Sequence, residues 1–325
     1  MSAHSVDPVE LGELAYEALR LAFIPWQRER RIAKERERVR IARFSSRVIS
    51  AGSVHSLALR RDGRIACWGY NFFGQAPPGG VDGDFVAIAA GGAHSLALRG
   101  DGGIACWGEN DEGEAPPAGV DGDFVAIAAG DAHSLALRGD GGIACWGEND
   151  QGQAPPGGVD GDFVAIAAGS WHSLALRRDG GIACWGYNRH GKAPPAGVDG
   201  DFVAIAAGGA HSLALRGDGG IACWGDNGDG QAPPAGVDGD FVAIAAGRYH
   251  SMALRRDGGI ACWGDNTQGQ APPDGVDGDF VAIAAGSWHS LALRRDENVA
   301  CWGRNHHGEA PPGGVDGPFG QNVDV

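Results

Sequence analysis

The chain has 325 residues, and its hydrophobic content of 43% is ample for a packed core. Its net charge of −15 is uneven, because residues 1–46 carry nine basic and seven acidic side chains whereas the rest carries 17 and 34. Nucleic-acid binding depends largely on neutralising phosphates, so the acidic body argues against such a partner and leaves it conceivable only for the first 46 residues.

The sequence also predicts where the protein resides. No apolar run approaches the roughly 18 residues of a membrane span, so no transmembrane segment is predicted. The first 25 residues include Asp7 and Glu10 where a secretory leader would be basic. We therefore expect a cytoplasmic protein with reduced thiols.

Residues 1–46 have the pattern of a helical head. Asp7 and Pro8 form a helix start signal, which predicts a first helix over about 8–24 that ends at Pro25. A second, basic helix is predicted over about 26–43. We expect residues 8–43 to dock, to self-associate or to bind a second partner; the alternative is a solvated charged helix.

Residues 47–319 consist of seven repeats. The seven cysteines are 39 residues apart, so they mark a repeat and not a disulfide pattern; they are Cys67, Cys106, Cys145, Cys184, Cys223, Cys262 and Cys301. A typical unit, residues 85–123, contains three strand candidates, "FVAIAA", "HSLALR" and "IACWG". Asp101-Gly102 predicts a tight hairpin between the second and the third.

These units predict an all-β, seven-bladed propeller. One blade carries apolar residues on both faces, Ile104 on one and Trp107 on the other, so each face needs a neighbour, and a closed ring provides one everywhere. An open solenoid would need distinct capping repeats, whereas the first and last units, 47–84 and 281–319, look like the others. Residues 320–325 are left as a C-terminal tail.

The repeated pattern "VAIAAG..HSLALR.DG.IACWG.N..GQAPP" resembles the regulator-of-chromosome-condensation repeat family. Its short form without an inserted wedge resembles bacterial propellers of the kind found in the second type of β-lactamase inhibitor protein. The resemblance implies the propeller fold and a binding role. Family members include an exchange factor for a small GTPase and protein inhibitors of enzymes, and the uniform 39-residue units depart from the longer, wedge-bearing exchange factor.

Each repeat also carries one histidine that could suggest a metal site: His55, His94, His133, His172, His211, His250 and His289. These histidines alternate with apolar residues, so core packing and a backbone hydrogen bond explain them. Equivalent positions in facing sheets lie about 10 Å apart, whereas zinc needs ligands at about 2 Å. We expect neither a metal nor a cofactor, and no catalytic constellation stands out from the repeat.

The repeats differ mainly in two short windows. The first is the pair of residues before the histidine, for example Ser170-Trp171, and the second is the six residues after "CWG", for example "YNRHGK" at 187–192. In an antiparallel blade both windows fall at the same end, and the near-constant Asp-Gly hairpins fall at the other. Loops at one end of a rigid scaffold are the usual place for binding.

The variable windows are rich in residue types that dominate protein interfaces. We predict the following partner-binding residues: Tyr70, Phe72, Phe73, Trp171, Tyr187, Arg189, His190, Arg248, Tyr249, Trp288, Arg304, His306 and His307. Units six, seven and one would form an aromatic and basic arc on ring closure, with a second cluster in unit four. Units two, three and five offer acidic residues instead: Glu109, Asp111, Glu112, Glu114, Asp131, Glu148, Asp150, Asp226 and Asp229.

The leading hypothesis is a non-enzymatic propeller that binds a macromolecule, most of all a protein, through these windows. A glycan or small-ligand binder would use the same aromatic residues for stacking. An enzyme would need unique acid-base residues, and only unit seven, with His306, His307 and Glu309, comes near. Neutral drift of tolerant loops is the remaining alternative, although drift would not favour Trp, Tyr and Arg.

Overall fold

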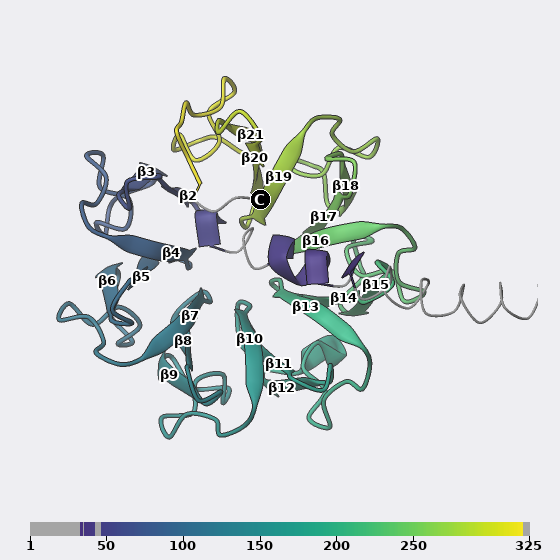
Figure 1. Ribbon diagram of the computed structural model, residues 1–325, viewed down its shortest axis with the longest axis horizontal. Coiled ribbons are helices and arrows are strands. Elements are labelled where there is room, and N and C mark those ends of the chain that lie inside the picture. The colour runs from purple at the N-terminus through teal and green to yellow at the C-terminus, as the bar shows by residue number, and fades with distance from the viewer. Residues whose placement is uncertain (1–32, 35, 43–46, 321–325) are drawn as a thin grey trace, which may run out of the picture. The chain divides into compact units, whose positions relative to one another are not determined.

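The computed structural model describes residues 33, 34, 36–42 and 47–320. The chain divides into two compact units, Met1–Glu37 and Arg38–Val325. In the second unit the strands form seven three-stranded antiparallel sheets, one per repeat, which succeed one another around a central axis (Figure 1). The predicted all-β, seven-bladed propeller is confirmed; blade 1 holds β1 to β3, and each later blade holds the next three strands.

The strand bounds repeat with the sequence. The first strands lie nearest the axis in Figure 1: β1 (Ile49–Ala51), β4 (Phe85–Ala90), β7 (Phe124–Ala129), β10 (Phe163–Ala168), β13 (Phe202–Ala207), β16 (Phe241–Ala246) and β19 (Phe280–Ala285). The middle strands are β2 (His55–Leu59), β5 (His94–Arg99), β8 (His133–Arg138), β11 (His172–Arg177), β14 (His211–Arg216), β17 (His250–Arg255) and β20 (His289–Arg294). The outer strands are β3 (Ile65–Gly69), β6 (Ile104–Gly108), β9 (Ile143–Gly147), β12 (Ile182–Gly186), β15 (Ile221–Gly225), β18 (Ile260–Gly264) and β21 (Val299–Gly303). A short 3-10 helix, η1 (Arg189–Gly191), follows β12 in the loop of blade 4.

The core lies between neighbouring blades. Leu96 and Leu98 of blade 2 pack against Phe124 and Ala136 of blade 3, and the same combination recurs around the ring. Ala136 is fully buried in the middle of its strand. Its small side chain lets the two sheets approach closely, so the alternation of leucine and alanine in "HSLALR" sets the blade spacing.

A belt of hydrogen bonds joins all seven blades. His55 Nε2 lies 2.9 Å from Ser95 Oγ in blade 2, and the same contact recurs from each blade to the next until His289 Nε2 meets Ser56 Oγ of blade 1 at 2.8 Å. Ser95 donates its only proton to the Gln75 carbonyl at 3.0 Å, so it accepts from the imidazole, which carries a proton on Nε2.

This belt corrects the expectation of a histidine bond to the backbone. The imidazole reaches the backbone only through the serine of the next blade, because the seven rings are fully buried between blades and the serine hydroxyl is the polar group within reach. Trp107 Nε1 donates to the same Gln75 carbonyl at 2.9 Å. The constant His, Ser and Trp of each repeat are thus explained by contacts between blades.

The C-terminal end of the propeller completes blade 1. In blades 2 to 7 the first strand begins with a phenylalanine paired with an arginine, as Phe85 pairs with Arg99. Blade 1 lacks this residue, and Phe319 takes its place in an antiparallel bridge to Arg60. Gly320 donates its N–H to the Leu59 carbonyl at 3.0 Å. The first unit therefore differs from the others, because the last residues of the propeller complete its first strand.

Part of the predicted head is described. The helix predicted over 8–24 lies outside the described residues, whereas residues 36–42 of the predicted basic helix are helical. Ile41 packs on the core of blade 6, and Ala42 packs on that of blade 5. The compact unit of the blades begins at Arg38 and not at residue 47, and the predicted domain limits stay a prediction. No helix in the described part of the chain is long and apolar enough to cross a bilayer.

Replacing Phe319 tests how the ring closes. Phe319 is 1% exposed and packs in a cluster with residues of blades 1 and 7, so Phe319→Ala should lower the free energy of unfolding by roughly 3–5 kcal/mol. Urea denaturation measures the change. The exposed Asp316→Ala should stay within about 0.5 kcal/mol, and a loss below about 1 kcal/mol for Phe319→Ala would contradict this closure.

The histidine belt predicts acid sensitivity. Desolvation by burial lowers the pKa of His211 from 6.5 to about 3 and that of His250 to about 4, and burial acts in the same direction on the other five belt histidines. Below pH 6.5 the unfolded chain binds these protons and the folded chain does not. Stability should therefore be full above pH 6.5 and fall as the pH drops towards 4, by about 1.4 kcal/mol per pH unit for each proton taken up.

Urea denaturation at pH values between 7.5 and 5 measures this dependence. The slope of the unfolding free energy against pH gives the number of protons taken up, which should exceed one as the pH falls below 6.5. A free energy that does not change over this range would contradict the neutral, buried state of the belt.

Candidate recognition rim

Both variable windows lie at one end of the propeller. The N–H of Tyr187, which opens the second window of blade 4, donates to the Trp171 carbonyl of the first window at 2.8 Å. The same backbone bond recurs in the other blades, for example from Glu109 to Ala93 at 3.0 Å. We call the two windows of all seven blades the variable rim. The Asp-Gly hairpins and "VDGD" turns form the opposite, constant face.

Side chains of the repeat hold the loops of the variable rim. Asn110 Oδ1 accepts the N–H of Ala115 at 2.8 Å, and the buried Glu114 carboxylate accepts the N–H of Glu112 at 3.0 Å. Most blades repeat both bonds with an asparagine and a buried Gln or Glu. Because these constant side chains fix the loop backbone, the positions between them can vary without cost to the fold.

The predicted aromatic arc consists of two groups of ring contacts, one between blades 6 and 7 and one between blades 7 and 1. The Tyr249 ring lies 5.4 Å from that of Trp288, and the His307 ring lies 4.8 Å from that of Tyr70. Phe72 continues the series from Tyr70, with ring centroids 6.3 Å apart, and contacts Phe73. Phe72 is 77% exposed and Phe73 is 42% exposed, so the arc presents apolar surface to solvent.

The basic residues of the arc differ in their surroundings. The Arg248 guanidinium lies over the Tyr249 ring at 5.5 Å. Arg304 instead forms an ion pair with the buried Glu309, at 3.2 Å. Arg304 thus pairs with a residue of its own loop, whereas His306 is exposed to solvent. The structure brings the aromatic residues together more closely than it brings the cations together.

Blade 4 carries the second predicted cluster. Trp171 is 42% exposed and lies edge-on to Tyr187, with ring centroids 6.0 Å apart. The buried Lys192 places its ammonium 5.7 Å from the Trp171 ring and 5.1 Å from the Tyr187 ring. Sequence reasoning missed Lys192, although it is the only lysine at a position that is Gln or Glu in the six other repeats, which is the signal that could have found it.

Lys192 also changes the loop that precedes it. A lysine ammonium cannot accept the N–H that Gln or Glu accepts elsewhere, and Lys192 Nζ donates to the Gly209 carbonyl of blade 5 at 3.0 Å instead. The loop becomes η1, in which His190 has φ = 67°. Burial lowers the pKa of Lys192, and the nearby Asp131 and Asp226 oppose this shift. Arg189 and His190 are exposed next to the aromatic pair.

Blades 2 and 3 form an acidic part of the variable rim. Partial burial, followed by repulsion from Asp111, raises the pKa of Glu109. Partial burial also raises the pKa of Glu148, and Asp150 and Glu112 add to it. These carboxylates crowd one another, so a cation brought to this part of the rim would relieve their repulsion.

The variable rim surrounds a shallow pocket at the end of the central channel. The small Ala-Gly ends of the first strands line it, together with the first window of most blades, including Asp131 and Arg248. Among the described residues, no group of three or more His, Cys, Asp or Glu could hold a metal ion. The features of this end are therefore shape, aromatic surface and charge.

The repeats match a known family of repeats. A family model described as the regulator of chromosome condensation (RCC1) repeat matches seven segments of the chain: residues 47–75, 85–114, 124–153, 163–192, 202–231, 241–270 and 280–309. Each segment covers the three strands of one blade and extends into its second window. The chain belongs to the RCC1 repeat family, whose propellers are commonly binding or interaction modules.

Solved structures agree with this fold. The CRINKLY WD40 ectodomain of the Arabidopsis thaliana receptor kinase ACR4 is similar with a TM-score of 0.65 and 24% identity, over 82% of this chain and 98% of that chain. The ectodomain of the Physcomitrella patens receptor kinase CR4 has a TM-score of 0.63 and 26% identity, over 79% of this chain and 72% of that chain. Prp20p from Saccharomyces cerevisiae, which binds Gsp1p and histones, has a TM-score of 0.63 and 21% identity, over 87% of this chain and 88% of that chain. No curated protein matches the sequence.

Exchanging Lys192 tests its role in the blade 4 loop. Lys192→Gln restores the acceptor found in blade 3, where Gln153 accepts the N–H of Gln151 at 2.9 Å. Such a bond contributes about 0.5–1.5 kcal/mol, so amide hydrogen exchange in residues 187–192 should slow roughly 3- to 10-fold. Mass spectrometry measures the exchange. Gln231→Lys in blade 5 is the matched reverse and should speed exchange in 226–231; unchanged exchange in both would show that this position does not control the loop.

Proposed function

We propose that the protein is a non-enzymatic recognition module that binds a protein partner through the variable rim. The observation that carries the proposal is the aromatic arc, in which Tyr249 contacts Trp288 between blades 6 and 7, and His307 contacts the series from Tyr70 to Phe73 between blades 7 and 1. Clusters of exposed aromatic side chains on a rigid scaffold are typical of protein interfaces, and scattered drift would not bring them into mutual contact.

The charge pattern supports a partner with a defined orientation. The aromatic arc with Arg248 covers blades 6, 7 and 1, and the crowded carboxylates of Glu109 and Glu148 cover blades 2 and 3. A partner with a basic patch beside an apolar one would fit in one orientation only. Such complementarity contributes mainly to association rate and specificity.

Two alternatives have less support. A sugar site would favour flat platforms; Tyr70 and Phe72 are nearly parallel at 15°, but Tyr249 and Trp288 are inclined at 52° and Trp171 and Tyr187 at 80°. For an enzyme, only unit seven was a candidate, with His306, His307 and Glu309, but Glu309 accepts the N–H of His307 at 2.7 Å and pairs with Arg304, so it holds its own loop. The uniform repeat supports the short, wedge-free form of the family, typical of bacterial inhibitor propellers, over a GTPase exchange factor.

The helical head extends the proposal to a second function. Its alternating basic and acidic residues, such as Arg30 and Glu29, favour a role in self-association or recruitment. A chain that lacks residues 1–37 retains Arg38 and the blades, so its assembly state and its bound partners show whether the head contributes.

Affinity capture from the native host tests the variable rim. Trp171→Ala, Tyr249→Ala and Trp288→Ala together should reduce recovery of the specific partner at least tenfold, since each interface aromatic can contribute about 2 kcal/mol or more. Quantitative mass spectrometry measures recovery. Arg64→Ala with Arg295→Ala on the constant face, two exposed residues in ion pairs, is the matched control and should leave recovery unchanged. Equal recovery by both variants would refute the proposal.

A further inference from the structure

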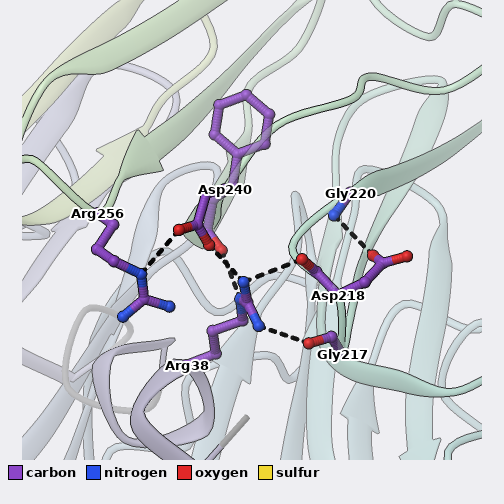
Figure 2. A network of polar contacts seen from close by, with 7 residues as sticks. Arg38, Gly217, Asp218, Gly220, Asp240 and Arg256 are labelled. Carbon is purple, nitrogen blue, oxygen red and sulfur yellow. Dashed lines mark hydrogen bonds and ion pairs between the residues drawn. The ribbon is translucent and has the colours of Figure 1, made fainter. Parts of the chain in front are cut away.

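The constant face contains one occupied arginine site. The buried Arg38 guanidinium donates to the carbonyls of Gly217 at 2.5 Å and Asp218 at 3.0 Å in the hairpin of blade 5, and to that of Phe241 at 3.0 Å in blade 6 (Figure 2). It also pairs with the Asp240 carboxylate. Three carbonyls and one carboxylate from two neighbouring blades thus enclose one guanidinium.

The residues around Arg38 explain why the helix is held there. Arg256 Nε donates to the other oxygen of Asp240 at 3.0 Å, so the carboxylate is shared by two arginines. Partial burial raises the pKa of Asp240, but the hydrogen bonds and charges of Arg256 and Arg38 outweigh this and bring it below its usual value. Ile41 covers a cluster that contains Val242, which is only 2% exposed. The site combines a guanidinium socket with an apolar contact.

The same socket recurs 78 residues earlier, between blades 3 and 4, where Gly139, Asp140, Asp162 and Phe163 take the four positions. Its backbone geometry matches. Gly142 N–H donates to Asp140 Oδ1 at 2.9 Å, as Gly220 N–H donates to Asp218 Oδ1 at 2.9 Å. The N–H of Phe163 donates to the carbonyl of Gly141 in the hairpin at 3.1 Å. The N–H of Phe241 donates to the carbonyl of Gly219 in the same way, also at 3.1 Å.

The two sockets differ in what covers them. At blades 3 and 4, Arg178 alone holds Asp162, through bonds of 2.8–3.0 Å to both carboxylate oxygens. Both side chains are exposed, at 68% and 63%. Val125, the counterpart of Val203, which packs on the same cluster as Ala42, is 41% exposed, and its carbonyl accepts a hydrogen bond from Arg47 at 3.2 Å. The second socket therefore presents both the polar and the apolar half of the contact to solvent.

Other blade pairs lack part of this set. At the position of Gly139 and Gly217, blades 1, 4, 6 and 7 carry Arg61, Arg178, Arg256 and Arg295, which place a like charge beside an incoming guanidinium. The pair formed by blades 2 and 3 also has a glycine at this hairpin position. It lacks the arginine that supports the aspartate, however, because Gly139 stands at the position that Arg178 and Arg256 hold in the other two pairs. Among the repeats of the Arg38 site, the socket between blades 3 and 4 is thus the one in which every residue of the site is retained.

We propose that the socket between blades 3 and 4 is a second protein-docking site, which takes an arginine of a partner helix together with apolar residues three and four positions further on. Arg38, Ile41 and Ala42 show this contact in the chain itself. The carboxylate and carbonyls accept the arginine, and the exposed Val125 accepts the apolar residues. The site lies at the opposite end from the variable rim, so both could be occupied at once.

The test uses the full chain and a fluorescent peptide with the sequence of residues 33–43, AKERERVRIAR. Fluorescence anisotropy at about 150 mM salt should show saturable binding. Asp162→Asn should weaken it about tenfold, because the charge-assisted contact to the carboxylate is lost. Asp279→Asn is the matched control, since Asp279 pairs with Arg295 at similar exposure but beside Arg256, and it should change affinity less than twofold.

Further arms separate the site from simple attraction of charges. A peptide with Arg38→Lys keeps its charge but loses the fork, so it should bind at least tenfold more weakly. Equal binding of the two peptides, equal effects of Asp162→Asn and Asp279→Asn, or no saturable binding would overturn the proposal. A loss of binding with Asp240→Asn instead would show that the peptide exchanges with the chain's own helix, which would also overturn it.

Discussion

The hydrogen bond from each belt histidine to a serine of the next blade is the contact on which the rest of this structure depends. A three-stranded blade has two apolar faces and cannot bury either alone, so every blade is defined by its neighbours. The belt makes this dependence directional. His289 donates the last hydrogen bond of the belt to Ser56 of blade 1, and Phe319 takes the position of the phenylalanine that blade 1 lacks. Closure is therefore both polar and apolar.

The belt also supports the variable rim. The serine hydroxyl and the indole of the repeat tryptophan both donate to one loop carbonyl, such as that of Gln75, at the end of the second window. The rigid core thus continues into the base of each loop, and asparagine and Gln or Glu side chains hold the rest. Variation between these points changes the surface without changing the scaffold. Lys192 is the exception, because it replaces a holding residue and reshapes its loop.

The two ends of the propeller use repetition in different ways. The variable rim differs from blade to blade and is suited to one large, asymmetric partner. The constant face repeats one set of carbonyls and carboxylates, so a contact seen once is available again wherever the neighbouring residues allow it. Gly217 leaves room for Arg38, whereas an arginine at this hairpin position would place a like charge there, and Gly139 stands at the same position two blades earlier. The glycine in the hairpin and the arginine that supports the aspartate together decide whether the site is complete.

Much of this protein followed from its sequence. The 39-residue period, the two-residue alternation of each strand and the Asp101-Gly102 turn are local signals, so blades, hairpins and the common end of both windows were predictable, as was the place of aromatic residues such as Trp171. Contacts between blades were not predictable, because sequence period carries no information about which atoms meet across a sheet interface. The serine partner of each histidine, the use of Phe319 in blade 1, the position of Lys192 beneath Trp171 and Tyr187, and the burial of Arg38 were decided only by tertiary structure, since each joins residues from different blades or from distant parts of the chain.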